Sequence, residues 1–162
     1  MQQRDFFGIY DGALEREFCR ATIARFEADP HKTIGKVGDG TRDGSVRPEI
    51  KSTTEIMLTA DRPDWGDVLA RATSSLRTEL PRYMAQWRAA LPVDIRVEDF
   101  RIARYLPGEH FHYHFDNIGG SVTRVITAQW FLNDVAEGGA TEFPWQNMAV
   151  QPRAGRLMLA PV

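Results

Sequence analysis

Residues 104–116 read RYLPGEHFHYHFD and hold three of the four histidines of the chain. Polar and aromatic residues alternate along the second half of this stretch, which is typical of a β-strand with two different faces. On a regular strand, His110, His112, His114 and Asp116 lie on the same face. The stretch therefore predicts a sheet-rich fold in which one strand carries a face of imidazoles and a carboxylate.

The last two members of this face, His114 and Asp116, have the spacing of two metal ligands. Their Cα atoms are expected about 6.6 Å apart, so both side chains can converge on one ion. One further histidine would complete the facial triad that suits non-haem Fe(II). With 12 aspartates in the chain, a His-x-Asp arises by chance roughly one time in four, so its context decides. For His110 and His112, the alternative to a role as metal ligands is that they are ordinary solvent-exposed histidines beside a strand end.

Period-two hydrophobic patterns predict further strands on both sides of this stretch. The run at 125–132, VITAQWFL, is apolar on both faces, as a central strand must be. EGG at 137–139 and PRAG at 152–155 are turn sequences that separate the last strands. The predicted strands are residues 50–58, 93–97, 100–102, 125–132, 141–144 and 156–162.

The N-terminal half has helical periodicity instead. Apolar residues recur at three- and four-residue spacing from an N-cap at Asp11 to the stop at 29–30, and again over 65–91, where Pro81 should kink or restart the helix. Residues 31–49 hold four glycines and few apolar side chains, which favours a mobile loop. Early helices followed by short strands predict an α+β fold whose sheet curls into a barrel or jelly roll.

Composition excludes several classes of protein. The chain has 162 residues, 43% of them hydrophobic, which suits a single domain over residues 1–162. A net charge of −2 gives no field that would gather nucleic acid. The longest apolar run is far shorter than the roughly 20 residues of a membrane span. The N-terminus has no secretory signal, so we expect a cytoplasmic protein. Cys19 is the single cysteine and is expected to be a packing residue.

Five motifs follow one another along the chain, and their combination is far more specific than any one of them. They are RYLPG at 104–108, HFD at 114–116, RVITAQWFL at 124–132, EGGATEFP at 137–144 and PRAG at 152–155. In this order the chain resembles the prolyl 4-hydroxylase-like branch of the Fe(II)- and 2-oxoglutarate-dependent dioxygenases. The resemblance covers about residues 95–162, with a weaker echo at IKSTTEIML, residues 50–58. It implies a double-stranded β-helix, or jelly roll, with N-terminal supporting helices.

The resemblance assigns expected roles to individual residues. His114 and Asp116 match the first two iron ligands, and Tyr105 matches a tyrosine whose hydroxyl contacts 2-oxoglutarate; the alternative for Tyr105 is an aromatic that fills the barrel. Thr127 and Gln129 are polar groups on one face of an apolar strand, and the cosubstrate could supply the partners they require. Two residues depart from the family pattern: Phe131 stands where some relatives have tyrosine, and Lys51 replaces an arginine.

The distal part of the expected site has no match in the sequence. In the family, a second iron-binding histidine follows the first two ligands along the chain. A basic residue about ten positions later pairs with the far carboxylate of 2-oxoglutarate. No histidine follows His114 here. We therefore expect a fragment, truncated at its C-terminus within the dioxygenase domain, that lacks its last strands and is poorly stable. His110 and His112 are poor replacements, because they share one strand with His114.

The resemblance implies an oxidoreductase that uses Fe(II), 2-oxoglutarate and O2, with ascorbate as a helper, to hydroxylate an unactivated C–H bond. The expected substrate is a prolyl residue of a peptide or protein, although the site residues themselves do not name proline and a small-molecule substrate stays open. Residues 31–49 are a candidate lid, with a surface loop of no role as the alternative. Trp145 either contacts substrate at the barrel mouth or covers core.

Two readings without catalysis stay open. The first is a cupin-like binding module, since Gly108 followed by His114 and Asp116 imitates the start of a cupin motif, but the second cupin half does not occur. The second is a degenerate, metal-free jelly roll kept for protein interaction. A histidine and a basic residue encoded downstream of Val162 would support the oxygenase, and a stop codon would favour the degenerate module.

Overall fold

The computed structural model describes residues 6–38, 44–59, 61–87, 95–98, 100–117 and 121–162. Its helices are α1 (Arg16–Ala28) and α2 (Gly66–Gln86), with short 3-10 turns η1 (Pro63–Trp65) and η3 (Pro144–Gln146). Its strands are β1 (Gly8–Tyr10), β2 (Thr33–Ile34), β3 (Thr54–Leu58), β4 (Phe100–Arg104), β5 (Ile126–Phe131), β6 (Thr141–Phe143), β7 (Met148–Val150) and β8 (Arg156–Pro161).

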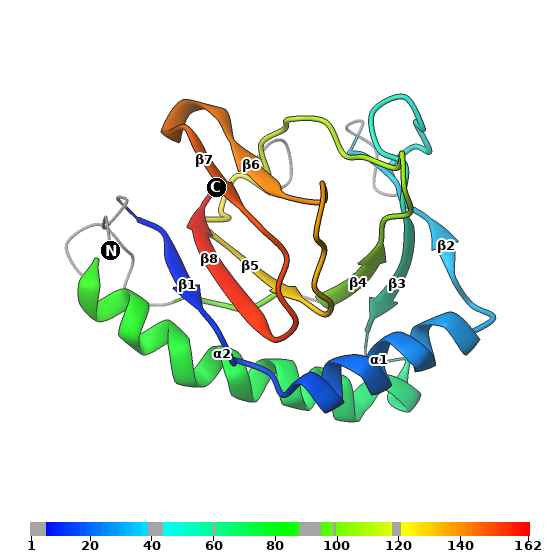
Figure 1. Ribbon diagram of the computed structural model, residues 1–162, viewed down its shortest axis with the longest axis horizontal. Coiled ribbons are helices and arrows are strands. Elements are labelled where there is room, and N and C mark those ends of the chain that lie inside the picture. The colour runs from blue at the N-terminus through cyan, green and yellow to red at the C-terminus, as the bar shows by residue number, and fades with distance from the viewer. Residues whose placement is uncertain (1–5, 39–43, 60, 88–94, 99, 118–120) are drawn as a thin grey trace.

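The strands form two three-stranded antiparallel sheets and one hairpin. The sheet orders are β1-β8-β5 and β2-β3-β4, and β6 pairs with β7. Figure 1 shows both helices along one side of the strands and the β6–β7 hairpin on the other side. Within the described residues, no helix is both long and apolar enough to cross a membrane. The predicted combination of supporting helices and antiparallel strands is confirmed.

The pleat of each strand divides its side chains between the helices and the hairpin. Strand β8 lies in the middle of its sheet, and its residues 157–160 are completely buried. One face of β8 packs on α2 in a cluster of Leu76, Tyr83, Leu157 and Leu159. The other face packs toward the hairpin in a cluster of Phe7, Phe131, Val150, Met158 and Ala160. We call this second side of the strands, which faces away from the helices, the barrel interior.

The helices follow the prediction except at two points. Helix α1 begins at Arg16 and not after Asp11. The residues before it instead form β1, which pairs with β8, and Asp11 accepts hydrogen bonds from Arg156. Pro81 lies inside α2, which continues to Gln86 without a restart. Leu76 and Tyr83, on either side of the proline, are anchored on β8, so packing holds both halves of the helix. The predicted end of this helix at Leu91 lies outside the described residues.

The strands differ from the prediction where pairing depends on distant residues. Residues 95–97 form no strand, and Val93 lies outside the described residues. Strand β5 was expected at the centre, but among the described strands it is at an edge and β8 is central, because β1 pairs with the free side of β8. Segment 31–49 was expected to be a mobile loop, but its described residues include β2, which pairs with β3, and a bridge from Val37 to Ser45; residues 39–43 lie outside the described residues. Cys19 is fully buried, as expected of a packing residue.

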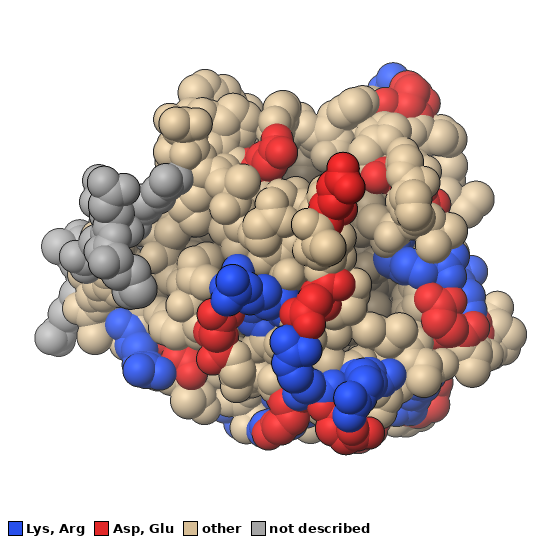
Figure 2. Space-filling model, in the orientation of Figure 1, with Lys and Arg blue, Asp and Glu red and all other residues tan. Residues whose placement is uncertain are grey.

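Charged side chains of both signs are interspersed over the helices. Figure 2 shows blue and red residues side by side along the lower part of this face, with no extended region of one sign. Ion pairs account for part of this pattern, such as Arg25 with Asp67 between α1 and α2, at 2.8 Å. Exposed pairs of this kind contribute little stability each, so the helices are held mainly by their apolar faces.

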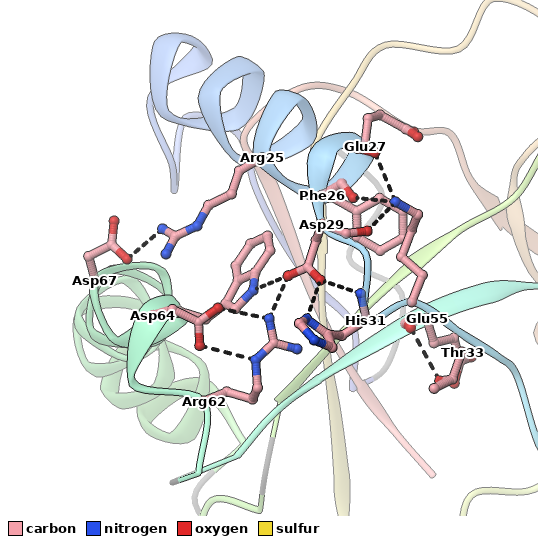
Figure 3. Close-up of polar contacts among 12 residues, drawn as sticks. Arg25, Phe26, Glu27, Asp29, His31, Thr33, Glu55, Arg62, Asp64 and Asp67 are labelled. Atoms are coloured by element: carbon pink, nitrogen blue, oxygen red, sulfur yellow. Dashed lines mark hydrogen bonds and ion pairs between the residues drawn. The ribbon is translucent and has the colours of Figure 1, made fainter.

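Asp29 is the C-cap residue of α1, and Figure 3 shows the hydrogen bonds of its carboxylate. The carboxylate is nearly buried and accepts hydrogen bonds from the backbone N–H of His31 at 2.7 Å, from Trp65 Nε1 at 2.8 Å and from Arg62. These donors, the His31 N–H first, hold the pKa of Asp29 well below its ordinary value despite the opposing effect of burial. The carboxylate thus ties α1 to the turn before α2.

We expect Asp29→Asn to lower the free energy of unfolding at pH 7 by an amount that shrinks on acidification. Because the folded pKa is depressed, the stability from ionised Asp29 is present above the unfolded pKa of about 3.9 and is lost as pH falls below it. Urea unfolding of wild type and variant at pH 7 and pH 3 measures this. The exposed Glu137→Gln is the control and should match wild type at both pH values. An Asp29→Asn deficit that is equal at both would contradict the prediction.

Candidate functional site

The histidine stretch does not continue β4 as a regular strand. After Arg104 the chain turns at 106–109, and only Phe111 makes a strand-type bridge, to Lys51. The expected single face of His110, His112, His114 and Asp116 is therefore wrong as a strand geometry. The rings of His110 and His112 pack on each other at 4.4 Å, whereas the ring of His114 stacks on Phe111 at 3.6 Å.

His114 and Asp116 nevertheless come together. Nε2 of His114 lies 3.2 Å from Oδ1 of Asp116, and both side chains are partly exposed. The other carboxylate oxygen, Oδ2, accepts a hydrogen bond of 2.6 Å from the Thr127 hydroxyl on β5. The hydrogen bond from His114, followed by that from Thr127, lowers the pKa of Asp116 to about 2 against the opposing effect of burial. Asp116 is thus an ionised carboxylate over the whole neutral range.

The orientation of the His114 ring is fixed from its other nitrogen. Nδ1 lies 2.8 Å from the carbonyl oxygen of His112. A carbonyl only accepts, so Nδ1 carries the proton in this contact. The hydrogen bond from Nε2 to Asp116 therefore belongs to the ring with a proton on both nitrogens, and a metal ion that replaced the Nε2 proton would meet the Nε2 lone pair on the side where Asp116 presents Oδ1. A backbone acceptor behind a ligating imidazole is the usual support in metal sites.

This donor set fits a divalent cation. Imidazole nitrogen and carboxylate oxygen are two of the three ligands of the facial Fe(II) triad. Within the described residues, no group of three or more His, Cys, Asp or Glu side chains is placed to hold a metal. Neither His110 nor His112 joins His114 and Asp116 in such a group.

The three expected cosubstrate residues lie around this pair in different ways. Tyr105 follows β4 with its ring about half exposed, and partial burial raises the pKa of its hydroxyl, with Glu55 and Asp116 adding to the rise. Thr127 is engaged by Asp116. Gln129 exchanges hydrogen bonds with Thr141 on β6, at 3.0 and 3.3 Å. The chain itself therefore supplies partners for Thr127 and Gln129.

A second group of polar residues lines the barrel interior from β3 and the residues before it. Lys51, Thr53 and Glu55 are all buried. Lys51 Nζ lies 2.6 Å from Glu55 Oε1, which also accepts a 2.9 Å hydrogen bond from Thr53. Burial lowers the pKa of Lys51, and the hydrogen bond to Glu55 partly offsets this. The ammonium also lies 4.9 Å from the ring of Phe111, so this group adjoins the histidine stretch.

Sequence reasoning missed most of this group, although a signal was present. In IKSTTEIML, residues 50–58, the polar residues Lys51, Thr53 and Glu55 stand at alternate positions. Ile56 and Leu58, at positions of the other face, pack toward the helices. The same alternation marks Arg101 on β4, between Phe100 and Ile102, which pack toward the helices. Polar residues at alternate positions of two paired strands indicate that this face of the sheet is polar and not part of a dry core.

Three aromatic residues complete the surroundings of the candidate site. Phe131 is buried in the cluster of the barrel interior, where it offers no hydroxyl. Trp145 is 78% exposed and stacks on the exposed ring of Phe115 at 5.3 Å, so it does not cover core. Phe115 lies between the two candidate ligands in sequence, which places this exposed pair beside the site.

No family model matches the chain. It is similar in sequence to a probable prolyl 4-hydroxylase 7 of Arabidopsis thaliana, with 28% identity over 152 residues that cover 88% of this chain and 43% of that protein. A probable prolyl 4-hydroxylase 3 of the same plant is 25% identical over 146 residues, covering 86% of this chain and 46% of that protein. The chain thus spans less than half the length of these curated relatives.

Solved structures share the fold. A viral collagen prolyl hydroxylase from Paramecium bursaria Chlorella virus-1, solved as a 2-oxoglutarate complex, matches with a TM-score of 0.63 and 18% identity over 98% of this chain and 78% of that one. A Pseudomonas putida prolyl-4-hydroxylase matches with a TM-score of 0.64 and 20% identity over 96% of this chain and 80% of that one. These similarities confirm the resemblance drawn from the motifs: in sequence and in fold the chain is prolyl 4-hydroxylase-like.

Proposed function

We propose that the protein is an Fe(II)- and 2-oxoglutarate-dependent dioxygenase that hydroxylates a prolyl residue of a peptide or protein. The observation that carries the proposal is the His114–Asp116 pair, with Nε2 and Oδ1 3.2 Å apart in a prolyl 4-hydroxylase-like fold. The overall reaction converts 2-oxoglutarate, O2 and a C–H bond into succinate, CO2 and a C–OH group, and ascorbate keeps the iron reduced. Bound iron and 2-oxoglutarate supply the oxidising chemistry.

In this proposal His114 and Asp116 are two of the iron ligands. The carbonyl of His112 and the ring of Phe111 hold the His114 imidazole in one orientation. Thr127 occupies Oδ2 of Asp116 and so leaves Oδ1 for the metal. Pre-oriented ligands of this kind reduce the entropy lost on metal binding. Thr127 is therefore a positioning residue, which is a narrower role than the direct cosubstrate contact expected from the sequence.

Tyr105 and Gln129 are proposed to contact 2-oxoglutarate. The Tyr105 hydroxyl is protonated at neutral pH, as any tyrosine with its ordinary pKa is, and burial raises its pKa further, so it can donate a hydrogen bond to a carboxylate. The Gln129 amide is held by Thr141 and keeps further hydrogen-bonding capacity, since an amide has two donor hydrogens and two acceptor lone pairs.

The surroundings of the pair suggest how substrate is held. Exposed Phe115 and Trp145 form a stacked surface next to the candidate ligands. Aromatic surfaces suit extended, proline-containing peptides. The segment 31–49 is a candidate lid: its Lys36 carbonyl accepts a 3.2 Å hydrogen bond from buried Lys51, which links the segment to the barrel interior.

The direct test measures succinate formed from 2-oxoglutarate in the presence of Fe(II), O2 and ascorbate. We expect succinate with a proline-rich peptide to exceed that with the same peptide in which alanine replaces proline, and the proline peptide to gain one oxygen by mass spectrometry. A chelator should return both rates to background. Succinate formation that never exceeds the chelated control would contradict the proposal and favour a jelly-roll binding module without catalysis.

A further inference from the structure

Three exposed aromatic side chains gather beside the candidate ligands. Tyr113 and Phe115 come directly before and after His114 in sequence, and they are 68% and 52% exposed. The ring of Phe115 stacks on that of Trp145, which is 78% exposed, with the two ring planes 17° apart. Large apolar side chains that remain exposed together mark an interaction site. The surface next to His114 is therefore built to contact another molecule.

A carboxylate without a cationic partner belongs to the same surface. The Tyr113 hydroxyl donates a 2.5 Å hydrogen bond to Oε2 of exposed Glu142 on β6. Among the described residues, no cation pairs with this carboxylate and no group donates to its Oε1. Figure 2 agrees, since it shows a red residue without a blue neighbour in the region where Figure 1 places β6. We call Tyr113, Phe115, Glu142 and Trp145 the aromatic–acidic patch.

The patch joins two segments at two points, Tyr113 with Glu142 and Phe115 with Trp145. The two contacts lie on either side of His114 along the chain. A peptide that places a side chain on the patch therefore lies beside the candidate metal ligands.

We propose that the aromatic–acidic patch binds a lysine or arginine side chain of the peptide substrate. The inference rests on the proposed function and adds a substrate class to it, a peptide with a basic residue near the hydroxylated proline. The positive head group suits both an aromatic face and a carboxylate, and the aliphatic stem suits the apolar ring surface. An apolar side chain would instead cover the Glu142 carboxylate without compensating its charge, which is unfavourable.

The test compares two proline-containing peptides that differ in charge. One has lysine on both sides of the proline, and the other has methionine in place of each lysine. Fluorescence anisotropy of the labelled peptides measures their affinity in the presence of a chelator, so that no turnover occurs. We expect wild type to prefer the lysine peptide by about 10-fold, the size of a cation–π contact together with an exposed ion pair. The preference should fall in about 1 M salt, which screens exposed charges.

Variants of the patch separate the charge from the aromatic surface. Glu142→Gln should bind both peptides equally, because it removes the charge and keeps an acceptor for Tyr113. Trp145→Leu should reduce the preference about threefold, and Trp145→Phe should recover most of this loss. Glu137→Gln is the matched control, since it removes an exposed carboxylate from the turn before β6, and it should keep the wild-type preference. Thermal unfolding verifies that each variant is folded.

A Glu142→Gln protein that keeps the wild-type preference, or a wild type that has none, would overturn the inference. Self-association that disappears in Trp145→Leu while both peptide affinities stay unchanged would assign the patch to a second copy of the chain and overturn it as well. Succinate formation with Fe(II), 2-oxoglutarate and each peptide tests the proposed function separately. Equal hydroxylation of the two peptides would overturn this inference alone, whereas succinate at the chelated background with both would overturn the proposed function.

Discussion

Replacing His114 by alanine is expected to lower metal-dependent succinate formation to the chelated background, a loss of more than about 100-fold. Loss of a residue that only supports a metal ligand already costs 10- to 100-fold in affinity or activity, so loss of a ligand costs more. Of the candidate pair, only the Asp116 carboxylate would remain. Calorimetric titration with Mn(II) measures the loss of affinity directly, and succinate formation measures its consequence.

His112→Ala is the matched control for this variant. The two histidines are two residues apart, but His112 supports His114 through its backbone carbonyl, which alanine keeps. Its own ring packs on His110 and takes no part in the His114–Asp116 contact. We expect His112→Ala to bind metal within about threefold of wild type, since exposed substitutions rarely exceed ±0.5 kcal/mol. Equal losses in the two variants would show that neither imidazole is a specific ligand.

The sequence predicted that residues 114 and 116 meet, but for a reason that the structure does not bear out. Strand alternation put His110 and His112 on the same face as the pair, whereas the backbone leaves strand geometry after Arg104. The contact between His114 and Asp116 depends instead on a backbone carbonyl, a stacked ring and the Thr127 hydroxyl. Hydrophobic periodicity reports which residues face a core, and it carries no information about such local polar contacts.

For the fold as well, the sequence predicts the features that depend on neighbouring residues and misses those that depend on distant ones. The helix patterns and the turns at 137–139 and 152–155 are local, and each was predicted close to its observed place. Gly155 has φ of +82°, and a Cβ there would lie 2.1 Å from the carbonyl oxygen of Leu14, so the last of these turns also requires glycine. The pairing of β1 with β8 joins residues about 150 positions apart. A three-residue strand has too short a pattern to predict such a partner.

The second large effect is expected at the buried ion pair of Lys51 and Glu55. Glu55→Gln removes the charge that compensates Lys51, whose side chain is 1% exposed. Breaking a buried pair costs about 3–5 kcal/mol of unfolding free energy, and we expect the lower end because glutamine keeps an oxygen that accepts from Lys51 and Thr53. Urea unfolding at pH 7 measures it. Glu49→Gln, in an exposed pair with Arg47, is the control and should cost less than about 1 kcal/mol.

The deficit of Glu55→Gln should shrink as pH rises. Burial already lowers the pKa of Lys51, and the hydrogen bond to Glu55 opposes that effect, so removing Glu55 lowers the pKa further. The unfolded chain, with a lysine pKa of about 10.4, then binds more protons than the folded one, and stability increases with pH toward that value. Unfolding at pH 10 should therefore recover part of the loss seen at pH 7. The double variant Lys51→Met, Glu55→Leu should recover most of it at both, since an apolar pair of similar volume replaces a buried ion pair at little cost. A deficit independent of pH that persists in the double variant would mean that packing at this position, and not the unpaired ammonium, limits stability.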